Sequence, residues 1–280
     1  MIDLNDKSLI AIQLFDEYYF VGHQKEGFHI LKTEKGLVLF DSMDIPDADE
    51  KYLIPGLAKL GLNKEKIVML CLTHGHFDHY LGADHVWRRT GCEVALSAED
   101  ALYMVYSLDN RDKDPLIPRI TKLVKDGDIL QFGATEVYVM GAPGHTPGCL
   151  NYVFSVHHHG KEHKAILFGR FGVFGPGQYY GTYPETNDHA VEQAGIFAST
   201  CVKSWEYCKK NGVDIYLNPH PHLCRMMELA AQNSADPQAE NALVIGTEGV
   251  RQWIVDRFDD CMKSILKFTD IREEYKGESN

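Results

Sequence analysis

Short apolar runs recur along the chain and predict two groups of β-strands. Each run is rich in branched aliphatic and aromatic residues and is bounded by glycine or polar residues, a pattern typical of strands. A Lys35-Gly36 pair separates the first two runs and indicates a tight hairpin turn. The predicted strands are residues 28–33, 37–40, 67–72, 136–140, 150–156, 166–168 and 214–217.

Apolar residues at helical spacing predict helices between and after these strands. The predicted helices are residues 47–60, 81–89, 98–106, 188–210 and 242–268. Two strand-rich halves with this arrangement of helices predict two sheets packed face to face with helices outside. No proline-rich or serine-rich linker separates the halves, so we expect residues 1–280 to form a single domain.

Composition and charge exclude several classes of protein and one class of binding partner. Apolar residues make up 44% and charged residues 24% of the chain, which excludes disordered and fibrous proteins. The chain has 28 basic and 40 acidic residues, so its formal net charge is −12. A field of that sign repels phosphate backbones, and no basic patch is visible, so we expect no nucleic-acid partner.

The sequence also predicts where in the cell the protein is located. The longest apolar runs are far shorter than the ~20 residues that a membrane-spanning helix needs. Residues 1–20 lack the basic segment and apolar stretch of a signal peptide. Seven cysteines without a C-x-x-C pair suit reduced thiols better than a disulfide framework. We therefore expect no membrane association and a cytoplasmic location.

The densest chemistry lies in residues 73–82, directly after the predicted strand 67–72. His74, His76, Asp78 and His79 fall within six residues, and a strand end opening into a loop lets such side chains converge. Imidazole and carboxylate together suit zinc far better than calcium or magnesium. A hydrogen-bonded polar turn would rarely need so many ligand-type residues at one point, so the segment predicts a metal site.

Two later histidines lie in rigid turns after predicted strands. His145 lies in the turn Ala142-Pro143-Gly144-His145-Thr146-Pro147-Gly148, and His220 lies between two prolines that restrict its backbone. Each alone would more often be structural, but beside the six-residue cluster both are candidate ligands. His222 falls outside that turn and is expected near the site or at the surface. The run 157–159, with His163 nearby, is expected in a solvent-facing hairpin loop.

These motifs resemble those of the metallo-β-lactamase superfamily. The pattern H-x-H-x-D-H-x-x-G is complete from His74 to Gly82, and P-G-H-T-P-G and a strand-end histidine follow in the family's order. The resemblance implies an α+β fold, a four-layer αβ/βα sandwich with two zinc ions at the sheet edges, and a structural role for Asp41. It assigns His74, His76 and His145 to the first zinc and Asp78, His79 and His220 to the second.

One departure from the family pattern distinguishes its branches. Most hydrolases of the superfamily place a metal-bridging Asp after a late strand, and many class B β-lactamases place a Cys there. Here residues 166–172 read Ile-Leu-Phe-Gly-Arg-Phe-Gly, which resembles the third subclass of class B β-lactamases except for Arg170. Facing the cleft, Arg170 would repel the second zinc or bind a substrate carboxylate; facing outward, it would be a solvated surface residue.

The expected function is zinc-dependent hydrolysis of a small molecule. Metal-bound hydroxide would open a cyclic amide such as a β-lactam, and Asp78 would both ligate and orient the nucleophile. Arg170 is the second candidate catalytic residue. A lactonase or other ester hydrolase remains an alternative, as does a non-catalytic metal-binding scaffold. The sequence leaves the physiological substrate and the oligomeric state open.

Overall fold

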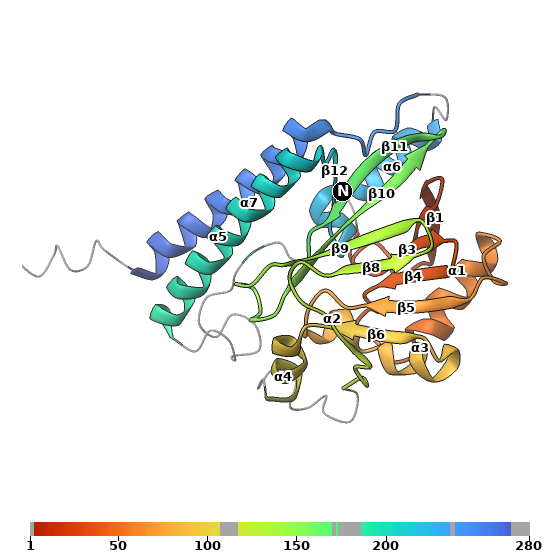
Figure 1. Ribbon diagram of the computed structural model, residues 1–280, viewed down its shortest axis with the longest axis horizontal. Helices are drawn as coiled ribbons and strands as arrows, with labels where there is room; N and C mark the ends of the chain where they lie inside the picture. The colour runs from red at the N-terminus through yellow and green to blue at the C-terminus, as the bar shows by residue number, and fades with distance from the viewer. Residues whose placement is uncertain (1–2, 107–116, 170–171, 173–185, 236–238, 270–280) are drawn as a thin grey trace, which may run out of the picture.

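The computed structural model describes residues 3–106, 117–169, 172, 186–235 and 239–269 of the chain. Two β-sheets form its centre (Figure 1). The first sheet has seven strands in sequence order, antiparallel from β1 to β4 and parallel from β4 to β7. Its strands are β1 Ile10–Phe15, β2 Tyr18–Gly22, β3 Gly27–Thr33, β4 Gly36–Phe40, β5 Ile67–Cys71, β6 Glu93–Leu96 and β7 Lys122–Leu123.

The second sheet has five strands in the order β12-β11-β10-β9-β8. Its neighbouring strands are antiparallel except for β11 and β12, which are parallel because the helix α5 connects them. The strands are β8 Ile129–Phe132, β9 Thr135–Gly141, β10 Leu150–His158, β11 Lys161–Leu167 and β12 Ile215–Leu217.

The two sheets pack face to face through a buried apolar core. Phe40 of β4 stacks on Phe154 of β10 with ring centroids 5.3 Å apart, and Tyr18 of β2 contacts the same ring at 5.2 Å. All three side chains are at most 2% exposed, so the contact between the sheets is dry. Burial of such large apolar surfaces is the main favourable contribution to folding.

Helices cover both outer faces. A second apolar cluster joins the first sheet to η1 Asp49–Leu53, α1 Ile54–Lys59, α3 Ala83–Thr90 and α4 Ala98–Tyr106. On the second sheet, the long helices α5 Asn187–Asn211 and α7 Gly246–Thr269 lie side by side (Figure 1). Shorter helices α2 Phe77–Tyr80, η3 Pro221–Cys224 and α6 Met226–Ala235 complete the described elements. The structure confirms the predicted helix–sheet–sheet–helix layers.

Several local predictions differ from the structure. The last helix begins at Gly246, not at residue 242, because Val244 pairs with Ile215 in an isolated β-bridge. The predicted helix 81–89 begins two residues later, as α3 Ala83–Thr90, and the separate short helix α2 ends at Tyr80. Strands β1, β6, β7 and β8 and helices α2, η3 and α6 were not predicted.

The histidine run 157–159 is only partly in a loop. Strand β10 extends to His158, and the hairpin turn is His159-Gly160, with both residues at positive φ. His157 pairs with Glu17 at 2.7 Å, and His163 is buried in β11. The solvent-facing loop prediction was therefore wrong for His157, His158 and His163, because strand pairing continues almost to the turn.

Two expectations about the chain as a whole can be compared with the structure. All seven cysteines are buried and none forms a disulfide. None of the helices in the described ranges combines the length and apolar character that a bilayer crossing requires.

Candidate metal centre

Three strand ends deliver the candidate ligands to one edge of the sandwich. Strand β5 leads into the segment that starts at Thr73, β9 leads into the turn around His145, and β12 leads into the turn around His220. Leu150 N donates to Thr73 O at 2.8 Å, which ties the edge of the second sheet to the end of β5. The three strand ends therefore bring the candidate ligands of both clusters together.

The first triad contains His74, His76 and His145. One potential ligand atom from each side chain lies within 4.8 Å of the others. His145 Nε2 and His76 Nδ1 are only 2.8 Å apart, so these two nitrogens point to one place. All three side chains are buried, with at most 3% exposed. The triad is a candidate metal-binding cluster.

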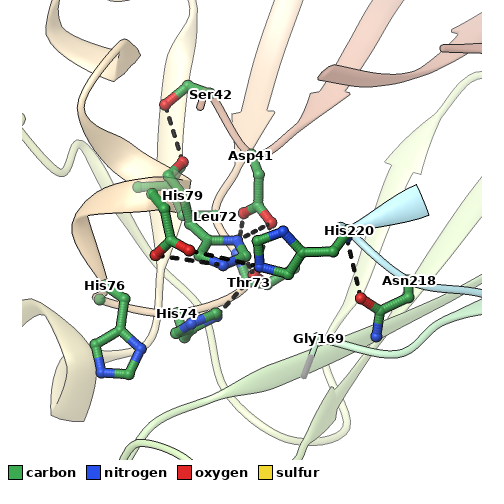
Figure 2. Close-up of polar contacts among 12 residues, drawn as sticks. Asp41, Ser42, Leu72, Thr73, His74, His76, His79, Gly169, Asn218 and His220 are labelled. Atoms are coloured by element: carbon green, nitrogen blue, oxygen red, sulfur yellow. Dashed lines mark hydrogen bonds and ion pairs between the residues drawn. The ribbon is translucent and has the colours of Figure 1, made fainter. Parts of the chain in front are cut away.

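The second triad contains Asp78, His79 and His220 and lies against the first. Asp78 Oδ1 is 3.7 Å from His79 Nε2, and Asp78 Oδ2 is 3.5 Å from His220 Nε2. The rings of His74 and His79 are 3.9 Å apart between centroids, so the two clusters share a wall. Figure 2 shows His79 and His220 on the same side of His74.

Each of the five histidines directs its other ring nitrogen to a fixed partner. Such partners set the tautomer and orientation of a metal-ligating imidazole. The pairs are His74 Nδ1 with Thr73 Oγ1 at 3.0 Å, His76 Nε2 with Tyr103 Oη at 3.0 Å, His145 Nδ1 with Gly172 O at 3.0 Å, His79 Nδ1 with Asp41 Oδ2 at 2.7 Å, and His220 Nδ1 with Lys25 O at 3.1 Å. These partners fix the orientation of all five rings in the two triads.

Asp41 organises the end of β5, as the sequence resemblance implies. Its carboxylate accepts hydrogen bonds from Thr73 N at 2.7 Å and Thr73 Oγ1 at 2.8 Å, in addition to His79 Nδ1 (Figure 2). Asp41 adopts a left-handed backbone with φ of 57°, which turns the chain sharply after β4. This turn aims the carboxylate at the ligand segment.

Asp100 and Tyr103 are site residues that sequence reasoning missed. Asp100 is fully buried and accepts hydrogen bonds from Gly75 N at 2.7 Å, Thr146 Oγ1 at 2.6 Å and Gly148 N at 2.6 Å. It therefore joins the two segments that carry the first triad. Burial raises the pKa of Asp100 to about 6, although all three hydrogen bonds lower it.

Nothing in the local sequence distinguishes these two residues. An acidic residue in the first turn of a helix is common because it complements the helix dipole, and Asp100 occupies that place in α4. Tyr103 follows one turn later and reads as part of the same amphipathic pattern. The sequence offers one signal: Asp100 and Tyr103 are three residues apart, which places both side chains on one face of α4.

The donor chemistry of the two triads fits zinc. Five imidazoles and one carboxylate form a set that borderline divalent metals prefer, whereas calcium and magnesium favour oxygen alone. His79 Nε2 is buried and has no hydrogen-bond partner among the described residues, as expected of an atom that binds a ligand. The two triads are thus candidate metal-binding clusters.

One predicted site residue lies outside the part of the chain that the structure describes. Arg170 lies outside the described residues, as do Phe174, Tyr179, Tyr180 and Tyr183, the aromatic residues that follow it in the sequence. Gly169, the described residue before Arg170, donates its backbone N–H to Asn151 Oδ1 at 2.8 Å. A Cβ atom added to Gly169 would lie 2.1 Å from Leu150 O. Only glycine fits this position.

His222 is half-buried and belongs to neither triad, as expected from its place outside the turn. Its ring centroid lies 5.8 Å from that of His220.

Comparisons with known proteins agree with this geometry. Residues 29–157 match the family model described as the metallo-beta-lactamase superfamily. A hydroxyacylglutathione hydrolase of Haemophilus influenzae is 29% identical over 130 residues, covering 44% of this chain and 58% of that protein. Another, from Rhodopseudomonas palustris, is 28% identical over 167 residues and covers 56% of each. The chain thus spans little more than half the length of these curated relatives.

Solved structures resemble the chain over almost its whole length. BJP-1, a subclass B3 metallo-beta-lactamase of Bradyrhizobium japonicum, has a TM-score of 0.75 at 23% identity, covering 92% of this chain and 94% of that one. The FEZ-1 metallo-beta-lactamase of Legionella gormanii has a TM-score of 0.76 at 20% identity, covering 95% and 99%. Residues 29–157 thus match the metallo-beta-lactamase superfamily, and the chain has the metallo-beta-lactamase fold.

Proposed function

We propose that the protein is a zinc-dependent hydrolase that opens a cyclic amide, with β-lactams as the leading substrate class. The observation that carries this proposal is the pair of buried triads at the sheet edge, with the outer nitrogen of every histidine held by a partner. Such preorganisation limits the cost of assembling the site around a metal and a substrate. The superfamily is one of hydrolytic metalloenzymes, which supports the reaction type.

In this proposal His74, His76 and His145 hold one zinc ion, and Asp78, His79 and His220 hold the other. When bound, zinc supplies Lewis acidity, which polarises a carbonyl and lowers the pKa of water. Asp78 has a further role, because its carboxylate accepts a hydrogen bond from the attacking water and orients it toward the carbonyl. Burial of Asp78 to 8% exposure excludes bulk water that would compete for this bond.

The segment after β11 supports the choice of a cyclic amide. Residues 169–172 read Gly-Arg-Phe-Gly and offer no Asp or Cys to bridge two metals. The structurally similar BJP-1 and FEZ-1 are named metallo-beta-lactamases, although at 23% and 20% identity they support only the fold. We propose that Arg170 acts at the site, either on a substrate carboxylate or against the second metal ion.

Thioester or ester hydrolysis is the second candidate. The curated relatives from Haemophilus influenzae and Rhodopseudomonas palustris are named hydroxyacylglutathione hydrolases, and their sequences match 44% and 56% of this chain. Acyl transfer to water from a thioester, a lactone or a β-lactam begins with the same attack on a carbonyl, so the two triads would serve each. The third possibility is a scaffold that binds metal without turnover.

One panel of assays separates these functions. Zinc-loaded protein is offered nitrocefin, a glutathione thioester and a set of lactones, before and after treatment with a chelator. We expect chelator-sensitive turnover that is fastest with nitrocefin. Faster turnover of the thioester or a lactone would replace the proposed substrate class, and bound zinc with no turnover would favour the scaffold.

A variant pair tests the site itself. The double substitution His74→Ala with His76→Ala should remove the first zinc equivalent and abolish turnover, while circular dichroism shows the fold retained. His85→Ala is the matched control, because His85 is exposed on α3 and belongs to neither triad. Unchanged activity in the double variant would refute the assignment of the triads.

We also propose that residues 1–280 act as one domain on a small molecule without a nucleic-acid partner. The apolar core that joins the sheets includes residues from Leu14 to Cys261, which supports the single domain. The formal net charge of −12 supports the absence of a nucleic-acid role.

A further inference from the structure

A third group of metal-ligand side chains lies at the hairpin between β2 and β3. It consists of His23, Glu26 and Asp44, and we call it the hairpin cluster. Its ligand atoms lie within 4.8 Å of one another, as do those of the two triads. His23 and Glu26 are 1% and 2% exposed, and Asp44 is half-buried. The proposed hydrolysis uses none of them.

Two loops at one edge of the first sheet build the hairpin cluster. His23 N donates to Glu26 O at 2.9 Å and closes a four-residue turn that brings both side chains together. The turn is tight, because a Cβ on Gly22 would lie 2.4 Å from Glu26 O. Asp44 comes from the loop after β4, where Ser42 N donates to His79 O at 2.7 Å and holds that loop against the second triad.

Glu26 lacks the hydrogen-bond donors that a buried carboxylate needs. Neither oxygen accepts a hydrogen bond from a nitrogen or hydroxyl donor among the described residues. Its polar neighbours there are the carboxyl group of Asp44 and the ring of His23, whose Nε2 lies 3.6 Å from Glu26 Oε1. Burial first, and then the charges of Asp44 and Asp78, raise the pKa of Glu26 to about 9. A buried carboxylate among other carboxylates is unfavourable unless a cation or a proton compensates its charge.

His23 supplies a neutral nitrogen donor. Burial lowers the pKa of His23 to about 4, and its ring packs edge-on against Tyr52 with centroids 5.4 Å apart. Lys7 is an exposed residue whose Nζ lies 3.2 Å from His23 Nε2. The ammonium group of Lys7 therefore occupies a place where positive charge is favoured. One imidazole and two carboxylates form a donor set that suits divalent first-row transition metals.

We propose that the hairpin cluster is a third divalent-cation site, in which His23 Nε2, Glu26 and Asp44 bind an ion such as Zn²⁺. The ion replaces the ammonium group of Lys7. His23 Nδ1 then carries the ring proton and gives up its long 3.3 Å contact from Lys25 N. Since Lys25 O accepts a hydrogen bond from His220 Nδ1 at 3.1 Å, the ion fixes the turn that orients a ligand of the second triad.

Metal content of the full-length protein tests this proposal. Protein stripped by a chelator is dialysed against Zn²⁺, and bound zinc is measured by mass spectrometry as a function of free zinc. We expect three equivalents in the parent protein and two in Glu26→Gln, whose third site should be at least tenfold weaker because a charged ligand is lost. Lys7→Met should bind the third ion several-fold more tightly, since the competing ammonium group is removed.

Control variants show whether a change in bound zinc comes from the hairpin cluster. Asp47→Asn removes an exposed carboxylate three residues from Asp44 and should retain three equivalents. If Glu26→Gln does not fold, Asp44→Asn provides the same comparison at a half-buried position. The double variant of His74 and His76 should lose the first ion and keep the third, which separates this proposal from the proposed hydrolysis.

Two results would overturn the third site. One is a parent protein that saturates at two equivalents, both of which persist in Glu26→Gln and Asp44→Asn, in which case the ammonium of Lys7 or a proton on Glu26 neutralises the cluster. The other is a third equivalent that persists in both Glu26→Gln and Asp44→Asn, which would place that ion elsewhere on the chain.

Discussion

Replacing Asp41 by asparagine should change the tautomer of His79 and weaken the second triad. In the parent protein the carboxylate accepts a hydrogen bond from His79 Nδ1 at 2.7 Å, so Nε2 is free to bind a metal. An asparagine that keeps its oxygen on Thr73 N presents an NH₂ group to His79 instead. His79 Nδ1 then accepts, the ring proton moves to Nε2, and that nitrogen can no longer ligate.

The expected loss of zinc affinity follows from the energy of the hydrogen bond between Asp41 and His79. A hydrogen bond to a charged group contributes about 1.5–3 kcal/mol, and this is the energy that holds the productive tautomer. At about 1.4 kcal/mol per factor of ten, the second zinc should bind roughly 10- to 100-fold more weakly in Asp41→Asn. The first triad should change less, because Asp41 reaches His74 through Thr73 Oγ1, while His76 and His145 are held by Tyr103 and Gly172.

Zinc titration in competition with a chromophoric chelator measures both affinities, and nitrogen chemical shifts of the histidine rings report the tautomer directly. Asp84→Asn is the control, since Asp84 makes an exposed ion pair with Arg88 on α3. Second-site affinity within twofold of the parent, with the His79 proton still on Nδ1, would refute the reasoning.

Three further changes give separate tests. Tyr103→Phe removes the hydroxyl that lies 3.0 Å from His76 Nε2 and should weaken the first zinc about tenfold in the same titration. Hydrogen bonding to Glu17 raises the pKa of His157, so this half-buried pair stabilises the fold below the unfolded pKa and the effect is lost as pH rises through the folded pKa. Glu17→Gln should therefore cost about 0.2–1 kcal/mol in urea unfolding at pH 5.5 and less at pH 8. Arg170→Ser should tighten a weaker second zinc site if the arginine faces it, and equal zinc affinities in the parent, unchanged by the substitution, would contradict that role.

The sequence alone identified most of the candidate centre. Four ligand-type residues lie within six positions directly after an apolar run, and such density at a strand end is a local signal. His145 and His220 were recognisable because proline and glycine mark the turns that hold them. The alternation of apolar runs and helical patterns was also sufficient to predict two sheets with helices outside, since each element must bury its apolar face.

Two predictions from the local sequence were wrong because tertiary contacts outweighed local secondary-structure propensity. Residues 242–245 continue a helical pattern, but Val244 pairs with Ile215 and delays the helix. The histidines before the β10–β11 turn read as loop because they are polar. Strand pairing extends to His158 and Lys161, and this register is determined by the partner strand rather than by composition.

Only the tertiary structure revealed the residues that surround the ligands. Asp100 lies 25 residues from Gly75 and 48 from Gly148, and nothing in the first turn of α4 indicates that its carboxylate joins these segments. The hairpin cluster likewise combines a turn after β2 with a loop after β4. Ligands adjacent in sequence are placed by local chain geometry, whereas these contacts arise only when packing of the sheets and helices brings distant loops together.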